Sequence, residues 1–501
     1  MRLNSKILYS TIFLSTLSFG LSEDDIVKRL DALEKQVSEL QEENSELKGT
    51  LQKQNKESIE DELWGIHDRI DSVETMTLLD KVHLGLGFTQ RVDNFSKKYA
   101  DGTKVNDNNI WTTKFNLNMD SKITDDMKFT GRLSMYKYWA DSDPNSLSYR
   151  DSTEGRKPSS SALWVERAYV DWRLFDGEVP TYLTLGRQPS SDGLSYQYKD
   201  NTVRKSTYSA LAFDGAVDGI VLTSNFEKPT GMDNAALRLA YGKAFQSHQN
   251  YQYSGVSNYT GADIKTSTGT TLKDSNVYGV FADGSIPGIE GTLWQGYYVS
   301  ALDIPGTDMG MGNTGANADG FNQNIGDFSI IGGLVESTNI YDSGLDAFFQ
   351  YAYSKADPNG KVWTGPDGNG YGLMTNSLGD TSAKTGDALW AGVRYSLPFI
   401  DGGKIGYEYN QGSKYWFNFG SGSNDLTNKL ATKGSANEVY YIQDINRYAF
   451  LRVGGVFIDY DYSNSGDYRG EPIKISDLSA TQKPMVADNL TNVYLLFSIL
   501  Y

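Results

Sequence analysis

Apolar and polar residues alternate along most of this chain, in runs that begin near residue 81. In one run, Thr113, Phe115 and Leu117 alternate with Lys114 and Asn116. A period of two places successive side chains on opposite faces of a β-strand, so each run predicts a strand with one apolar and one polar face. The runs are about ten residues long, which is the length of a tilted strand that crosses a lipid bilayer.

The last run, 492–501, predicts how a sheet of such strands closes. Its apolar face consists of Val493, Leu495, Phe497, Ile499 and Tyr501. A soluble protein that leaves such a strand unpaired risks aggregation, whereas the last strand of a membrane barrel pairs with the first and turns its apolar face to lipid. We therefore expect 492–501 to pair with the first predicted strand, 81–92. Because Leu496 and Leu500 lie on the opposite face, a buried strand of a β-sandwich is the alternative.

The connections between the predicted strands alternate between long and short. Long polar stretches lie near 93–109, 140–160, 188–207, 246–274, 303–326, 355–385, 417–434 and 463–489, and short ones near 123–126, 175–180, 226–234, 285–290, 338–343, 398–403 and 444–446. Outer-membrane barrels have this asymmetry, with short periplasmic turns and long outer loops, and soluble sandwiches do not. We predict an all-β fold, an antiparallel transmembrane β-barrel of about 16 strands over residues 81–501, with 14 or 18 strands as alternatives.

The first 22 residues have the pattern of a secretory signal peptide. Arg2 and Lys6 precede the apolar run 7–19, and small residues follow it. The run is too short for a transmembrane helix, so we expect cleavage after it, with an uncleaved anchor as the alternative.

Apolar residues recur with a period of seven over 23–51, which predicts an α-helical coiled coil. A second helical pattern, out of register with the first and joined to it by a polar hinge at 49–57, extends this predicted stalk over 23–76. The a and d positions, which we predict to mediate oligomerisation, are Ile26, Leu30, Leu33, Val37, Leu40, Asn44, Leu47 and Leu51. A single buried Asn at an a position commonly fixes the oligomeric state, and we expect a homo-oligomer, with a trimer as the simplest form. The alternative is one amphipathic helix that lies on the barrel. Both ends of the barrel fall on the short-turn side, which places the stalk in the periplasm.

Composition excludes several classes of function. The chain has 501 residues and a net charge of −17, which argues against nucleic acid as a partner. It has no Cys and three His, so we expect no disulfide, no thiol catalysis, no metal site built on Cys or His, and no cofactor. The segments 357–360 and 367–370 have the Asp, Asn and Gly residues of ordinary turns, with a bound Ca²⁺ as the alternative. The glycine pattern at 310–315 is not followed by a helical pattern, and no GxSxG nucleophile motif is present, so we do not expect an enzyme.

Charged residues recur on the polar, inward-facing side of the predicted strands. The candidates for lining a pore are Lys128, Arg132, Arg167, Asp171, Arg173, Arg238, Arg394, Lys404, Glu408 and Arg452. Buried unpaired guanidinium groups are costly, and a water-filled channel removes that cost. One hypothesis is a ladder of basic residues that favours anionic solutes. The other is that these charges pair across a plugged lumen.

Several segments resemble an uncharacterised family of predicted outer-membrane, porin-like proteins of Gram-negative bacteria, a family of unknown function whose members carry a helical stalk. The similar segments are Gly131–Tyr136, Glu166–Trp172, Leu185–Gly193, Asp218–Leu222, Tyr440–Gln443 and Ile458–Tyr462. The resemblance covers most of 80–501 and implies the barrel fold and the cell outer membrane. In general porins, which this chain resembles only in architecture, the third outer loop narrows the barrel. By that analogy the constriction candidates are Asp192, Asp200, Arg204 and Lys205.

The leading functional hypothesis is a porin-like channel for passive diffusion of small hydrophilic solutes. A more specific form of this hypothesis is that the channel prefers anions. Its parts would be a signal peptide (1–22), a periplasmic stalk (23–76) and a barrel (81–501) surrounded by outer-membrane lipid. The alternative is a structural protein whose coiled coil tethers the membrane to peptidoglycan or to a periplasmic partner.

Overall fold

The structure is a computed structural model and describes residues 31–40, 82–139, 160–188, 192–204, 206–215, 217–245, 272–306, 323–364, 369–420 and 426–501. The chain divides into two compact units, Met1–Leu84 with Met119–Thr130, and Gly85–Asn118 with Gly131–Tyr501. No helix among the described residues is long and apolar enough to cross a membrane. The predicted signal peptide, 1–22, lies outside the described residues.

Residues 31–40 form a helix within the predicted stalk. An exposed ion pair joins Lys35 and Glu39 at 3.9 Å, one helical turn apart. Leu33 is 42% exposed and Val37 is 48% exposed on this helix. Of the other predicted coiled-coil positions, Leu40 is on the helix, and Ile26, Leu30, Asn44, Leu47 and Leu51 lie outside the described residues. The coiled coil therefore stays a prediction.

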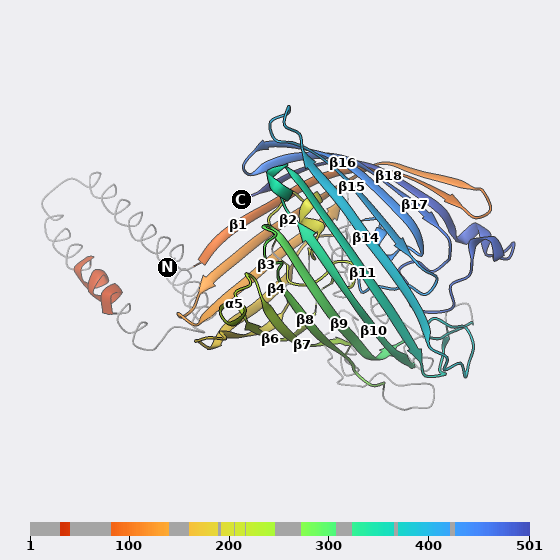
Figure 1. Ribbon diagram of the computed structural model, residues 1–501, viewed down its shortest axis with the longest axis horizontal. Coiled ribbons are helices and arrows are strands. Elements are labelled where there is room, and N and C mark those ends of the chain that lie inside the picture. The colour runs from red at the N-terminus through yellow and green to blue at the C-terminus, as the bar shows by residue number, and fades with distance from the viewer. Residues whose placement is uncertain are drawn as a thin grey trace, which may run out of the picture. The chain divides into compact units, whose positions relative to one another are not determined.

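Sixteen strands form one closed antiparallel barrel, as the alternation predicted (Figure 1). They are β1 (Val82–Tyr99), β2 (Lys104–Lys122), β3 (Met127–Tyr138), β4 (Ser160–Phe175), β5 (Thr181–Arg187), β6 (Asp218–Asn225), β7 (Ala236–Phe245), β8 (Ser275–Ser285), β9 (Thr292–Pro305), β10 (Asn324–Ser337), β11 (Leu345–Pro358), β14 (Lys384–Ser396), β15 (Gly403–Gly412), β16 (Gly434–Asn446), β17 (Ala449–Tyr460) and β18 (Ala487–Leu500). Two short strands, β12 (Trp363–Thr364) and β13 (Gly370–Tyr371), form a separate sheet between β11 and β14.

The barrel closes where the sequence predicted, between β1 and β18. The two strands are antiparallel, and the ladder runs from Gly87 opposite Leu500 to Tyr99 opposite Ala487. Every other strand of the barrel also has a partner on each side, so the barrel sheet has no free edge. A closed sheet satisfies its backbone hydrogen bonds internally, which is what a strand in lipid requires.

The two faces of β18 show the alternation between lipid-facing and inward-facing positions. Val493 and Leu495 are exposed on the outer face, whereas Asn492 and Ser498 are buried on the inner face. The same outward exposure of large apolar side chains recurs at Ile331 on β10 and elsewhere around the barrel. A barrel that presents apolar residues outward and polar residues inward is built to span a membrane.

The connections also alternate in length, with one correction to the prediction. The short turns are 123–126, 176–180, 226–235 (with α5, Glu227–Thr230), 286–291, 338–344 (with η1, Ile340–Asp342), 397–402 and 447–448. The predicted long loop at 93–109 is wrong, because β1 and β2 continue through it to a tight turn, in which the backbone N–H of Tyr99 donates to the carbonyl oxygen of Thr103 at 2.8 Å. A strand that rises above the membrane is wet on both faces, so its sequence looks like that of a polar loop.

Folded loop segments and inward strand residues together form a hydrophobic core inside the barrel. It contains Tyr196 and Leu211 from the β5–β6 connection, Trp416, Phe417 and Leu430 from the β15–β16 connection, and Ile330, Phe348 and Trp390 from β10, β11 and β14. The rings of Phe348 and Trp390 pack edge to face with centroids 4.7 Å apart. Side chains of this core therefore fill the part of the lumen beside these strands.

Candidate functional site in the lumen

The β5–β6 connection, which was predicted as the third long loop, folds inward as a compact loop, which we call the lumen loop (192–214, of which residue 205 is not described). It contains the one-turn helix α4 (Tyr196–Lys199). The loop has a narrow neck, where the backbone N–H of Leu194 donates to the carbonyl oxygen of Tyr208 at 2.8 Å. A Cβ atom on Gly193 would lie 2.7 Å from the Cα of Ala210, so this close approach requires glycine.

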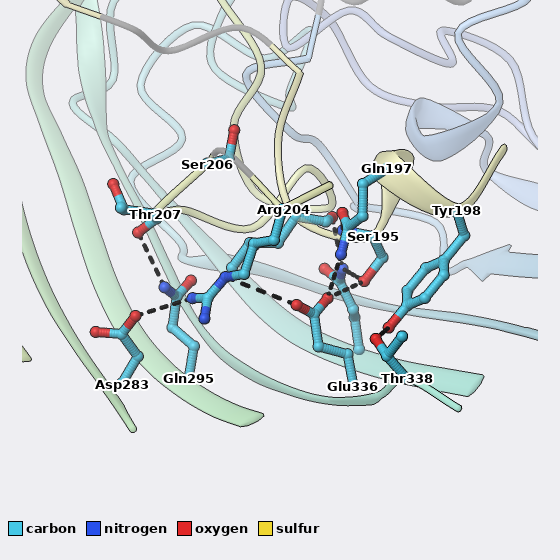
Figure 2. Close-up of polar contacts among 12 residues, drawn as sticks. Ser195, Gln197, Tyr198, Arg204, Ser206, Thr207, Asp283, Gln295, Glu336 and Thr338 are labelled. Atoms are coloured by element: carbon cyan, nitrogen blue, oxygen red, sulfur yellow. Dashed lines mark hydrogen bonds and ion pairs between the residues drawn. The ribbon is translucent and has the colours of Figure 1, made fainter. Parts of the chain in front are cut away.

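Polar side chains fix the lumen loop to the wall formed by β8, β9 and β10 (Figure 2). Arg204 Nη2 lies 2.9 Å from a carboxylate oxygen of Asp283, and Gln197 Nε2 donates to Glu336 at 2.9 Å. Further contacts with this wall join Ser195 to Glu336 (3.2 Å), Gln295 to the carbonyl oxygen of Thr207 (2.9 Å) and Tyr198 to Thr338 (3.5 Å). Because Glu336 and Asp283 are buried, these contacts are shielded from solvent.

On another side, β14 and β15 hold the carbonyl end of α4. Arg394 donates from Nη1 to the carbonyl oxygen of Tyr198 at 2.7 Å, while its Nη2 lies 2.6 Å from Asp346. Lys404 donates to the side-chain oxygen of Asn201 at 2.8 Å. Cations near the last carbonyl groups of a helix are favourable, so these two residues complete the end of α4.

Arginines of β3 and β4 bind the start of the lumen loop. Asp192 lies 3.1 Å from Arg132 and 2.9 Å from Arg167. Behind them, the buried carboxylate of Glu166 lies 3.2 Å from Arg132 and accepts a hydrogen bond from Ser134 at 2.6 Å. The loop is thus attached to walls on several sides of the barrel.

A fully buried charge cluster joins the lumen loop to the β15–β16 connection. Lys429, which lies in η2 (Lys429–Ala431), has its Nζ 2.5 Å from Glu408 and also contacts Glu438. Lys199 of the lumen loop lies 3.3 Å from Glu438, which also accepts a hydrogen bond from Tyr494 at 2.7 Å. Removing one partner of a buried charge pair destabilises the fold, because the other charge remains buried without compensation. The cluster therefore holds the two inward-folded segments in place.

An open space remains between the lumen loop and the wall formed by β1, β2, β3, β17 and β18. It has a volume of about 180 Å³. Its charged lining residues are Arg91, Lys114, Arg132, Lys199 and Arg452, together with Asp192, Asp200 and Asp214. The carboxylates of Asp93, Glu166 and Glu438 are buried and do not line the space, although they contact its cations. The cations therefore line the space, and part of the compensating negative charge lies on carboxylates that do not line it.

The charged positions selected from the sequence divide into several groups. Arg132 and Arg452 line the open space, and Arg167, Arg394 and Lys404 bind the lumen loop, which also contains Asp192, Asp200 and Arg204. The others have these contacts: Lys128 with Asp120 (3.0 Å), Asp171 with Thr184 (2.6 Å), Arg173 with Asp176 (3.5 Å), Arg238 with Asp283 (2.6 Å) and Glu408 with Lys429 (2.5 Å). Lys205 lies outside the described residues.

Sequence reasoning missed some charged residues of this site. Arg91 lies on the inward-facing side of β1 and within the predicted strand 81–92, so the alternation, followed to the end of that strand, would have found it. Lys429 follows the aromatic run Tyr415–Phe419, and such a run in a predicted outer loop signals a segment that folds inward. Among the described residues, no group of His, Asp and Glu side chains is arranged to hold a metal ion.

Lys433, at the end of the β15–β16 connection, is buried between two outer connections. Its Nζ donates to the backbone carbonyl oxygens of Asn464 and Asp467, the latter at 3.0 Å. Burial lowers the pKa of Lys433 to about 7, because the desolvated ammonium group loses its hydration, and the charge of Asp467 opposes this only in part.

The free energy of unfolding should therefore rise with pH between about pH 7 and pH 10, by up to about 1.4 kcal/mol per pH unit. In this window the unfolded chain, in which Lys433 has an ordinary pKa, binds more protons than the folded chain. Unfolding of the purified protein in detergent, measured at about pH 7.5 and 9.5, should show this rise in the natural chain and a smaller one in Lys433→Met. Equal pH dependence in the two proteins would contradict the assignment.

A family model described as "Protein of unknown function (DUF3373)" matches residues 104–501. Among solved structures, the high-pH structure of OprB from Pseudomonas putida is similar, with 11% sequence identity and a TM-score of 0.46. The match covers 86% of this chain and 96% of OprB. OmpF of Salmonella typhi in complex with daunomycin has 11% identity, 83% and 97% coverage and a TM-score of 0.42. In-vitro folded OmpT, an outer-membrane protein of Vibrio cholerae, has 12% identity, 83% and 98% coverage and a TM-score of 0.39. No curated protein matches the chain.

Proposed function

The chain belongs to the DUF3373 family of proteins of unknown function, and we propose that it is an outer-membrane, porin-like channel through which small hydrophilic solutes diffuse passively, with a preference for anions. The observation that carries the proposal is the cation-lined space beside the lumen loop. A sixteen-stranded barrel is wide enough to hold an aqueous path even when a loop occupies part of its interior. The proposal assigns no catalytic role to the chain.

The anion preference rests on how the charges are layered. Five cationic and three acidic side chains line the space, and further carboxylates lie behind the cations. An anion in the space is therefore closer to the guanidinium and ammonium groups than to the buried carboxylates. Coulomb energy falls with distance, so the nearer layer dominates its interaction.

Reversal potentials across a planar bilayer test both parts of the proposal. In a KCl gradient, the purified protein should give stable conductance steps and a reversal potential of the sign that means chloride passes more easily than potassium. Lys114→Gln should reduce the chloride-to-potassium permeability ratio by about threefold, because it removes one positive charge from the lining of the space. Lys122→Gln, in the exposed turn where Lys122 pairs with Asp125, serves as the control and should leave the ratio unchanged.

A silent bilayer would overturn the channel, and a preference for potassium would overturn its selectivity. Only the first of these results would favour the second candidate, a structural protein whose stalk (23–76) links the barrel (81–501) to peptidoglycan or to a periplasmic partner after removal of 1–22. The observation that favours a stalk interface is the exposure of Leu33 and Val37 on helix 31–40.

We further propose that the stalk assembles the protein into a homo-oligomer, with a trimer as the expected form. Exposed Leu33 and Val37 would be buried against the same residues of other copies, as a and d positions are in coiled coils. Leu33→Asn combined with Val37→Asn should convert oligomers into monomers on native gels, and deletion of 23–76 should do the same. Glu34→Gln, on the polar face of the helix, is the matched control. Oligomers that survive the deletion would show that the barrel assembles without the stalk.

A further inference from the structure

Two arginines face the open space from strands on either side of β18. Leu496 of β18 lies directly opposite Arg91 of β1 and directly opposite Arg452 of β17. All three side chains line the space. Two strand spacings separate the backbones of the arginines, which is about 10 Å. The row across the seam of the barrel is therefore a guanidinium group, an apolar side chain and a second guanidinium group.

The two guanidinium groups approach the same aromatic ring. The Cζ atoms of Arg91 and Arg452 lie 4.2 Å and 5.4 Å from the centroid of the Tyr494 ring. Tyr494 is the inward residue of β18 that precedes Leu496, and it is buried. Contact with an aromatic ring restricts the orientation of a guanidinium group, so Tyr494 helps to hold both groups in place beside the space.

Each guanidinium group uses only part of its hydrogen-bonding capacity. Arg91 contacts Asp93 through Nε and Nη2, at 2.7–2.9 Å. Arg452 bonds through Nη1 to the carbonyl oxygen of Lys199 and, at 2.9 Å, to Asp200. The Nε of Arg452 is buried and has no partner within the described part of the chain. Arginine presents five N–H donors, so both residues keep donors for a further acceptor.

An apolar shelf lies beside these donors in the same space. Leu496 is joined there by Phe450 of β17 and Leu500 of β18, both of which line the space. In the β17–β18 ladder, Phe450 is opposite Ser498, one inward position farther along β18 than Leu496. The shelf therefore extends from the arginine row towards the C-terminal end of β18.

We propose that the space beside the lumen loop binds organic carboxylates that carry an apolar body, such as a single aromatic ring, as they pass through the barrel. The carboxylate would take the remaining donors of Arg91 and Arg452, and the apolar body would lie on Leu496, Phe450 and Leu500. A cavity of about 150 Å³ holds a benzene molecule, so the observed space of about 180 Å³ accommodates one ring. This inference rests on the proposed channel function and specifies its solute class.

Benzoate and acetate are the probes, because they share the carboxylate and differ in the ring. Benzoate added to the full-length protein in a planar bilayer should interrupt the chloride current at concentrations at which acetate has no effect. Arg452→Gln and Arg91→Gln should each weaken the benzoate block about tenfold or more, since each removes a charged partner of the carboxylate. Arg447→Gln, in the turn before β17, is the matched control, and benzoate should block its current as strongly as that of the natural protein.

A second pair of variants tests whether the apolar shelf binds the ring of benzoate. Leu496→Thr should weaken the benzoate block about tenfold, as expected when a buried leucine contact is lost. The concentrations at which benzoate and acetate block the current should then differ less. Leu495→Thr changes the neighbouring residue, which is exposed on the outer face, and should leave the block unchanged. Chloride conductance without any benzoate block would overturn the solute class while leaving the channel intact. Equal block by benzoate and acetate would overturn the role of the shelf, and an absence of all conductance would overturn the proposed channel itself.

Discussion

Replacing Ser195–Tyr208 by a three-residue Gly-Ser-Gly linker should raise the single-channel conductance severalfold. The neck of the lumen loop places Leu194 next to Ser209, so a short linker can bridge the gap without moving β5 or β6. The excision removes α4 and with it the side chains that cross the lumen from one wall to the other. A sixteen-stranded barrel without this segment has room for a wider aqueous path. Planar-bilayer recordings of purified protein would measure the change.

A point variant tests the same loop with less disturbance. Gly193→Ala places a Cβ atom 2.7 Å from the Cα of Ala210, and a backbone contact of this kind cannot relax by a side-chain rotation. The neck must open, so the current should become larger or noisier. Gly296→Ala on β9 is the matched control, since a Cβ there meets nothing within 4 Å. Unchanged conductance in both the excision and Gly193→Ala would show that the path avoids this loop.

Lys429→Met should lower the free energy of unfolding by about 3–5 kcal/mol, which is the usual cost of removing one partner from a buried charge pair. Methionine fills the same volume but leaves Glu408 and Glu438 without the ammonium group between them, at positions that are 1–2% exposed. Urea or thermal unfolding in detergent would measure the loss. Raising the pH cannot restore the missing charge, so the loss should persist under alkaline conditions.

The control for this variant lies in the same connection. Lys414 pairs with Glu471 at 2.9 Å, and their side chains are 32% and 42% exposed. Lys414→Met should therefore cost no more than about 1 kcal/mol, as expected for a surface ion pair. The double variant Lys429→Met, Glu438→Gln should recover part of the loss, because it also removes one of the stranded charges. Similar stability of Lys429→Met and Lys414→Met would mean that water reaches the cluster.

Alternation and connection length were sufficient to predict the barrel. Val493 and Leu495 face outward and Asn492 inward because each peptide unit reverses the direction of the side chain, so the faces can be assigned without knowing any contact. The closing pair β1–β18 followed from the same pattern. The length of the first hairpin could not be predicted in this way. The ends of β1 and β2 near their turn lack the alternation of apolar and polar residues by which a strand is recognised.

The site was only partly predictable, because it depends on partners distant in the sequence. Arg394 could be placed inward from its position in β14, but its pairing with Asp346 requires the register between β11 and β14. The constriction role of the lumen loop was predicted by analogy with general porins. Its contacts with strands that are distant in the sequence could be identified only from the structure. Lys429 and Lys199 were outside the strands, where alternation gives no information, although both are buried in the lumen.

The ladder between β1 and β18 also determines the order in which the barrel can assemble. Its paired residues, such as Gly87 and Leu500, are about 400 positions apart, so no contact in the sheet has a greater sequence separation. The other barrel strands pair with near neighbours along the chain and can form hairpins first. Until β18 arrives, β1 and the latest strand present unpaired edges that can join other chains. Closure should therefore be the slow final step, and an incompletely exported chain should be held open and remain sensitive to proteases until that step occurs.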